Sequence, residues 1–251
     1  MATWVLLRGL VRESRHWEGF PDALRAARPL DNVVTVDLPG NGSLHHKKSP
    51  TRIGGFVLAL REELNRQGLQ PPFQVLALSL GAMTAISWMS TFPEEVERAV
   101  LLNTSVFRFS KFFERLRPEN YRAIVRGLFT SDRLKRERII LEITVNNLAA
   151  SDREVIAQRW AGFAASAGVS RMNSVRQLWA AARFKAPASL PDGLPVLVLN
   201  GGRDRLVSPA CSQALATGWG LPLRRESGAG HDLTLDAGGW VIEQINDWLT
   251  P

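Results

Sequence analysis

Six short runs of consecutive apolar residues alternate along the chain with longer segments of helical pattern. The runs predict strands at Thr3–Leu7, Val33–Asp37, Phe73–Leu78, Ala99–Asn103, Pro195–Asn200 and Leu223–Glu226. The longer segments predict helices at Trp17–Ala27, Ile53–Gln67, Leu80–Thr91, about Ser208–Thr217 and Gly239–Leu249. Strands separated by helix-length gaps are typical of a parallel sheet covered by helices on both faces. The pattern therefore predicts an α/β fold with a mostly parallel six-stranded sheet.

One long interval, from Thr104 to Leu190, interrupts this alternation because it contains only helical patterns. The patterns are broken at Pro118, Ser131-Asp132, Ser151-Asp152 and Gly168. A compact domain rarely holds a structureless loop of such length, so the interval predicts about four helices. We expect a helical lid at residues 105–190, inserted after the fourth strand. The core would then consist of residues 1–104 and 191–251.

Ser79 stands between the buried strand Phe73–Leu78 and the helix Leu80–Thr91, in the sequence Leu76-Ala77-Leu78-Ser79-Leu80-Gly81. A serine on a sharp strand-to-helix turn is the arrangement of a nucleophile elbow, which presents the hydroxyl at the edge of the sheet. Ala77 stands where the elbow usually has its first glycine, and we expect its methyl group to strain the turn without forbidding it. The alternative is a serine that caps an ordinary helix.

A carboxylate and a histidine follow the last two predicted strands. Asp204 lies in a glycine-bearing loop after Asn200, and His231 lies in a glycine-rich loop after Glu226. Open parallel sheets gather reactive groups at the carboxyl ends of their strands. The order Ser79, Asp204, His231 is the order of the α/β-hydrolase triad. The sequence therefore predicts a Ser-His-Asp triad, against the alternatives that Asp204 caps a helix and His231 is a loop residue.

With these motifs the chain resembles the α/β-hydrolase superfamily over nearly its full length. Leu6-Leu7-Arg8-Gly9-Leu10 resembles the first core strand and oxyanion loop of the family, and Val36–Gly42 resembles its Asp-Leu-Pro-Gly-x-Gly turn. The chain is most similar in style to compact bacterial esterases with a helical lid, such as pimeloyl-ester carboxylesterases, and to the related succinyl-hydroxycyclohexadiene-carboxylate synthases. Arg8 and Asn41 depart from the family pattern, as does Ala77. Arg8 either binds a substrate carboxylate or pairs with an acidic side chain, and the structural role is favoured.

The resemblance implies a hydrolase of carboxylic esters or thioesters that forms an acyl-enzyme. His231 would take the proton of Ser79, and Asp204 would orient the imidazole. The backbone N–H groups of Leu10 and Leu80 would form the oxyanion hole. Two alternatives stay open, namely a triad-dependent synthase or lyase of the menaquinone-pathway type, and a non-catalytic scaffold that binds a ligand or partner through its lid.

Most of the excess of basic over acidic residues in the chain lies within the predicted lid. The whole sequence has 31 Lys and Arg against 24 Asp and Glu, a net charge of +7. Between Arg108 and Arg138 alone, ten basic residues face four acidic ones. This excess either steers an anionic substrate or partner or only keeps the surface solvated. The lid aromatics, of which we expect a minority to touch substrate, are Phe107, Phe109, Phe112, Phe113, Phe129, Trp160, Phe163 and Trp179.

The sequence lacks the motifs of several kinds of cofactor site, metal site and targeting segment. No nucleotide loop, flavin site or metal-spaced pair of His or Cys is present, and His45-His46 is interpreted as solvated, so no cofactor or metal is expected. The chain enters its first strand without a signal-peptide pattern, and no apolar run is long enough to span a bilayer. The single Cys211 cannot form an internal disulfide. These features predict a cytoplasmic protein with neither a nucleic-acid partner nor a membrane span. The small-molecule ester or thioester substrate is what the resemblance implies.

Overall fold

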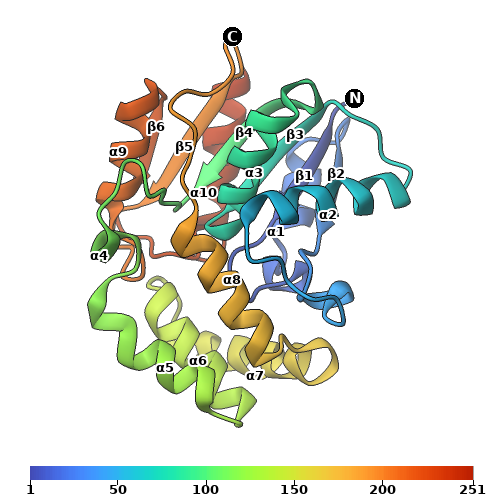
Figure 1. Ribbon diagram of the computed structural model, residues 1–251. Coiled ribbons are helices and arrows are strands. Elements are labelled where there is room, and N and C mark those ends of the chain that lie inside the picture. The colour runs from blue at the N-terminus through green and yellow to red at the C-terminus, as the bar shows by residue number, and fades with distance from the viewer. Residues whose placement is uncertain (251) are drawn as a thin grey trace.

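The computed structural model describes residues 1–250, which contain one sheet of six parallel strands (Figure 1). The strands are β1 (Thr3–Leu7), β2 (Asn32–Val36), β3 (Phe73–Leu78), β4 (Val96–Leu102), β5 (Val196–Gly201) and β6 (Leu223–Glu226). Their order across the sheet is β2-β1-β3-β4-β5-β6, and each neighbouring pair is parallel. The predicted fold is confirmed. Because β1 lies between β2 and β3, the chain changes direction across the sheet there, and the loops after β1 and β3 lie side by side.

Helices cover both faces of this sheet. The helices outside the β4–β5 interval are α1 (Phe20–Ala27), α2 (Ile53–Arg66), α3 (Leu80–Thr91), α9 (Pro209–Trp219) and α10 (Leu233–Leu249). Short 3-10 turns lie at Ser14–Trp17, Gly42–Leu44 and Pro93–Glu95. Helices α2, α3 and α9 pack in one hydrophobic cluster on one face, whereas α1 and α10 pack in another cluster on the opposite face.

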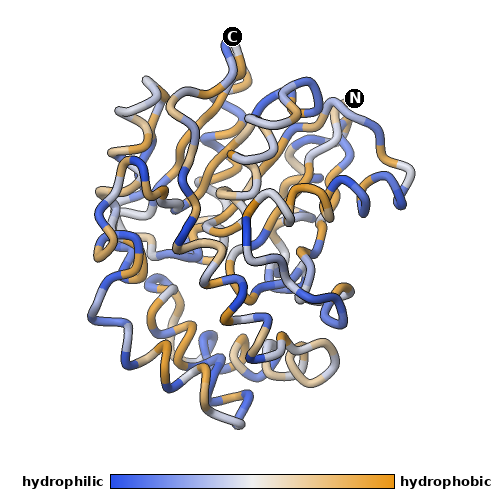
Figure 2. The backbone as a smooth tube through the Cα atoms, viewed as in Figure 1, coloured by the Kyte–Doolittle hydropathy of each residue, from blue (hydrophilic) through white to orange (hydrophobic). Residues whose placement is uncertain are grey.

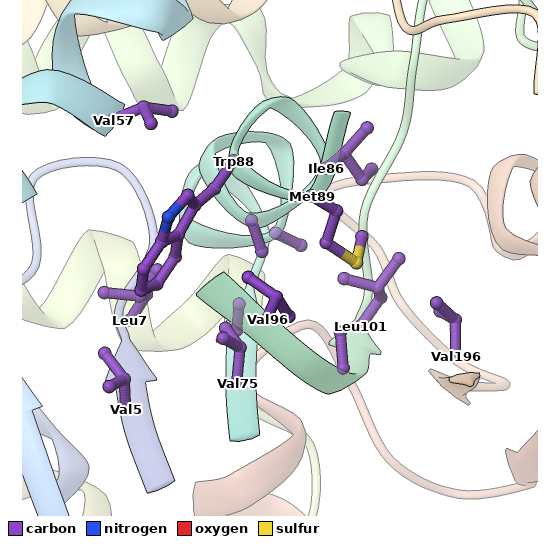
Figure 3. Close-up of a cluster of buried hydrophobic side chains, with 14 of the residues drawn as sticks. Val5, Leu7, Val57, Val75, Ile86, Trp88, Met89, Val96, Leu101 and Val196 are labelled. Atoms are coloured by element: carbon purple, nitrogen blue, oxygen red, sulfur yellow. The ribbon is translucent and has the colours of Figure 1, made fainter. Parts of the chain in front are cut away.

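The apolar runs exist because the central strands are buried on both sides. Along β3, Val75 and Ala77 face the α2–α3–α9 cluster, and Leu76 and Leu78 face the α1–α10 cluster. A strand covered on both faces needs apolar residues at consecutive positions and not only at alternate ones. Figure 2 shows this as hydrophobic colour along the inner strands. Figure 3 shows how Trp88 of α3 packs over the side chains of the first face.

Two predicted helices differ from the observed ones. The segment from Trp17 to Ala27 is split, because the 3-10 turn ends at Trp17 and α1 begins only at Phe20. Helix α10 begins at Leu233, six residues before the predicted start at Gly239. Its first turn is buried through Leu233, and the helix axis bends at Ala237, whose φ of −151° is not helical. The glycines after this bend hide the first turn from sequence reasoning.

A helical insertion joins β4 to β5, as predicted. It contains α4 (Phe112–Arg115), a 3-10 turn (Pro118–Asn120), α5 (Tyr121–Phe129), α6 (Arg133–Thr144), α7 (Ala150–Ala167) and α8 (Arg171–Arg183). The insertion forms a separate layer beneath the sheet in the view of Figure 1. Polar contacts tie it to the core, since Trp160 donates from Nε1 to Glu18 at 2.6 Å and Asn146 donates its N–H to Asp236 at 2.9 Å. Within residues 1–250, no helix combines the length and apolarity needed to cross a membrane.

Candidate active site

Ser79 occupies a strained turn between β3 and α3. Its φ of 56° and ψ of −112° lie in a region that residues with a side chain rarely adopt. The surrounding backbone holds this conformation, because the Ser79 N–H donates to Leu102 at 3.0 Å and the Ser79 carbonyl accepts from Thr104 Oγ1 at 3.0 Å. Ala77 does not carry the strain that the sequence suggested. It lies within β3, paired with Leu7 of β1.

Glycine occupies both positions at which the serine turn and the loop after β1 approach each other most closely. A Cβ atom added to Gly81 would lie 2.4 Å from the Leu7 carbonyl oxygen, which is closer than any real contact. A Cβ on Gly9 would lie 3.2 Å from Cβ of Ser79. The loop after β1 therefore packs directly on the serine turn. Leu10 follows Gly9 and lines the adjoining cavity, whereas Leu80 is the first residue of α3 and does not line it.

Asp204 and His231 are joined by a buried hydrogen bond. His231 Nδ1 lies 2.7 Å from Asp204 Oδ2. The other carboxylate oxygen, Oδ1, accepts the N–H groups of Leu206 at 2.8 Å and Val207 at 2.9 Å. An ionised carboxylate can only accept, so Nδ1 of the imidazole carries the proton and Nε2 is left to act as an acceptor. Asp204 therefore contacts both His231 and the loop that precedes α9.

Two polar residues that the sequence did not reveal hold the histidine loop. The side chain of Asn103, which directly follows β4, donates from Nδ2 to the carbonyls of Gly230 at 2.9 Å and His231 at 2.8 Å, and its Oδ1 accepts the Gly201 N–H at 2.8 Å. Asp236 accepts the Gly230 N–H at 2.6 Å. Burial raises the pKa of Asp236, although its backbone hydrogen bonds act in the opposite direction. The only sequence signal was the position of Asn103 at a strand end.

Ser79 and His231 line one cavity of about 210 Å³ between the sheet and the insertion. The structure shows no hydrogen bond between these two residues, and Asp204 lies behind His231, outside the cavity wall. Aliphatic side chains from the insertion dominate the lining, chiefly Ile124, Leu128, Ile139, Ile140, Ile143 and Leu178. Of the eight aromatic residues considered from the sequence, only Phe163 lines the cavity. The sequence did not point to the aliphatic residues of this lining.

Two buried ion pairs lie at the polar side of the same cavity. Arg8 forms two hydrogen bonds to Asp232, of 3.0 and 2.6 Å, and its guanidinium lies 4.8 Å from the Trp17 ring centroid. Arg8 therefore has the structural pairing that the sequence analysis favoured. Arg12 Nη2 approaches Glu137 Oε2 of α6 at 2.8 Å, in an ion pair without hydrogen-bond geometry. Burial acts to raise the pKa of Asp232, but the charge and hydrogen bonds of Arg8 outweigh it and hold that pKa below its ordinary value.

Gln177 of α8 links the insertion to the loop after β1. Its Oε1 accepts the N–H of Val11 at 2.9 Å, and its Nε2 donates to Asn41 Oδ1 at 2.8 Å and Ser49 Oγ at 3.1 Å. Val11 has a φ of 53°, which is unusual for a β-branched residue. The fully buried Gln177 thus fixes a strained loop next to Leu10. Sequence reasoning missed it because one glutamine in a helical pattern carries no signal of its partners.

Comparison with known proteins places this geometry in a family. The model of the family described as "Alpha/beta hydrolase family" matches residues 4–244. The chain belongs to the alpha/beta hydrolase family. No curated protein matches the chain. Within residues 1–250, no cluster of three or more His, Cys, Asp or Glu side chains could hold a metal ion.

Several solved structures share the fold of the chain. A hydrolase from Pseudomonas aeruginosa has a TM-score of 0.77 at 17% identity, covering 100% of this chain and 90% of that one. The enol-lactonase from Burkholderia xenovorans has a TM-score of 0.76 at 18% identity, with coverages of 100% and 92%. An esterase from Thermogutta terrifontis has a TM-score of 0.72 at 16% identity, with coverages of 99% and 89%. At such identities the likeness concerns the fold alone.

Proposed function

We propose that the protein is a serine hydrolase of carboxylic esters or thioesters, in which Ser79, His231 and Asp204 form the catalytic triad. The observation that carries this proposal is the 2.7 Å hydrogen bond from His231 Nδ1 to Asp204 Oδ2, at a cavity that His231 shares with the strained Ser79. Family membership supports it. So does the fold shared with an esterase and an enol-lactonase. Within the family, we favour a function similar to that of compact carboxylesterases with a helical lid.

The chemistry would proceed in two balanced steps. Ser79 Oγ attacks the carbonyl carbon of the substrate while Nε2 of His231 accepts the hydroxyl proton. The tetrahedral intermediate collapses, the proton passes to the leaving alcohol or thiol, and the acyl group stays on Ser79. Water then attacks the acyl-enzyme with His231 again as the base, and Ser79 regains a proton as the acid departs. Asp204 keeps the imidazole in the required tautomer throughout.

The developing oxyanion would be bound by the backbone N–H groups of Leu10 and Leu80. Leu80 begins α3, so its N–H has no intrahelical acceptor and points toward the start of the helix. Leu10 follows the loop glycine that packs on Ser79. Donors fixed in this way stabilise negative charge without having to reorganise during the reaction. The hydrogen bond from Val11 to Gln177 would keep the Leu10 segment in place.

The cavity indicates an acyl group that is largely aliphatic. We propose that residues 105–190 act as the lid and supply the acyl-binding wall, since Ile140 and Leu178 belong to α6 and α8. Burial of one methylene group stabilises a complex by about 0.8 kcal/mol, which corresponds to about fourfold in kcat/KM. With p-nitrophenyl esters of increasing chain length, kcat/KM should rise by up to about this factor per carbon until the cavity is full.

Steady-state hydrolysis of these esters tests the proposal. Ser79→Ala should abolish turnover and retain the circular dichroism spectrum, because one hydroxyl contributes little packing. Ser90→Ala is the matched control, since Ser90 is an exposed serine of the same helix. Undiminished hydrolysis by Ser79→Ala would refute the assignment of the nucleophile. No ester or thioester hydrolysis by the unmodified protein would favour a synthase or a non-catalytic scaffold.

A further inference from the structure

Helices α5 and α8 of the insertion expose apolar side chains in two helical rows. On α5 the row has spacings of four residues, and on α8 it has spacings of three and four, so each row lies on one helix face. The exposed fractions range from 36% to 67% for Tyr121, Val125, Phe129, Met172, Val175 and Trp179. We call these six residues the α5–α8 surface. Contiguous exposed apolar side chains indicate an interaction site, whereas single exposed apolar residues do not.

The two rows form one surface because α5 and α8 are antiparallel neighbours. Arg171, at the start of α8, donates from Nη2 to the carbonyl of Phe129 at the end of α5, at 3.2 Å. Arg115, which precedes α5, donates to the carbonyls of Ala181 at 2.6 Å and Ala182 at 2.9 Å near the end of α8. The start of one helix therefore lies near the end of the other. Figure 2 shows hydrophobic and hydrophilic residues interleaved along this lower layer of the molecule.

All charged side chains of α5 and α8 are basic. Neither α5 nor α8 contains Asp or Glu. Exposed arginines stand beside the apolar rows at Arg122, Arg126, Arg171 and Arg183. The guanidinium of Arg183 lies 5.2 Å from the ring centroid of Trp179. Apolar and aromatic side chains bordered by arginine complement an anionic lipid surface, which takes up the apolar groups below its headgroups and pairs the cations with phosphates.

The α5–α8 surface is also continuous with the acyl cavity. The inner sides of the same helices line that cavity through Ile124, Leu128 and Leu178. Val175 belongs to both regions, since it lines the cavity and is 47% exposed. At the seam between α5 and α8, the side chain of Val175 therefore lies between the cavity and the outer surface. An acidic protein partner would use the arginines, but it would not need this apolar continuity.

We propose that the α5–α8 surface binds anionic phospholipid bilayers and that the protein takes its acyl substrate from them through the seam. The second half of this proposal rests on the proposed function, whereas bilayer binding does not. Binding would be peripheral, with the apolar residues in the interfacial region and the sheet outside the membrane.

Vesicle co-sedimentation tests the binding with ether-linked phospholipids, which contain no carboxylic ester that the protein could cleave. We expect the protein to sediment with vesicles of equal parts phosphatidylglycerol and phosphatidylcholine, and much less with phosphatidylcholine alone. Phe129→Ser with Trp179→Ser should lower the partition coefficient by about tenfold or more. The matched control is Leu30→Ser with Leu58→Ser, two exposed leucines outside the insertion, which should leave binding unchanged.

A second variant keeps the test decisive if the aromatic one fails to fold. Arg122→Gln with Arg126→Gln removes two exposed charges, each worth about fivefold in binding to an anionic surface. Absence of binding to the anionic vesicles would overturn the proposal. Binding that depends on the arginines but not on Phe129 and Trp179 would also overturn it, because the apolar rows would then take no part in bilayer binding. Hydrolysis of a water-soluble ester, measured separately on the unmodified protein, tells whether the proposed function fails independently.

Discussion

Replacement of Arg8 by Met tests the energetic role of the ion pair next to the candidate triad. Arg8 holds Asp232 through two hydrogen bonds, and Asp232 is only 5% exposed. Met retains most of the apolar volume that lies over Trp17 but removes the charge. The carboxylate would then be buried without its cation, directly after His231 in the chain. Removal of one member of a buried pair costs about 3–5 kcal/mol, because the remaining charge loses its compensation.

The stability lost in Arg8→Met should be smaller in acid than at neutral pH. The pKa of Asp232 in the folded protein lies below its ordinary value, because the effect of Arg8 outweighs that of burial. The pair therefore stabilises the fold above about pH 4, the unfolded pKa of an aspartate, and this contribution is lost as the pH falls through the folded pKa. In Arg8→Met, burial acts without its main opposing partner and favours the protonated form of the carboxyl group, although the charge of Arg12 still acts in the other direction. The variant should lose least relative to the unmodified protein in acid.

Urea denaturation at neutral and acidic pH measures both effects. Arg98→Met is the control, since Arg98 forms an ion pair with Glu97 at the surface, and its loss should cost at most about 1 kcal/mol. A cost below about 1 kcal/mol for Arg8→Met at neutral pH would refute the reasoning. An equal cost at both pH values would refute the role assigned to the Asp232 charge.

Three further outcomes follow from the contacts of the site. Asp204→Asn should lower kcat for a soluble ester by about a thousandfold or more without unfolding, because the amide favours the wrong tautomer of His231; near-normal kcat would contradict this. Gln177→Leu should lower kcat more than it changes KM, because the Val11 N–H loses its acceptor, whereas Gln177→Glu keeps an acceptor oxygen and should restore part of the rate. Burial raises the pKa of Cys211 to about 11, so iodoacetamide at pH 8 should leave the folded protein unmodified and alkylate it in urea, as mass spectrometry would reveal.

The strands and the serine turn were predictable because their causes are local. A strand buried on both faces must be apolar at consecutive positions, and this is visible in Phe73–Leu78 without any knowledge of its neighbours. The position of Ser79 in a strand-to-helix turn follows directly from its place between that strand and α3. The start of α10 was not predictable, because burial of Leu233 against the core sustains a first turn that the glycines after Ala237 conceal.

The supports of the site escaped prediction because they join residues far apart in the chain. Asn103 contacts the His231 loop, and Gln177 contacts Val11, across separations of more than a hundred residues. Neither polar residue differs from a solvated one until the fold brings its partners close. The cavity lining depends likewise on how the insertion helices pack, so the sequence pointed to aromatic residues where the wall is mostly aliphatic.

The central claim is that Ser79 is a nucleophile activated by His231. Reaction with a fluorophosphonate probe, followed by peptide mass spectrometry, tests it most directly, because the probe bonds only to a serine whose proton a base can accept. We expect one adduct, on the peptide that contains Ser79, and its loss in Ser79→Ala and in His231→Ala. Labelling at another serine, or an adduct on Ser79 that forms equally fast in His231→Ala, would contradict the account.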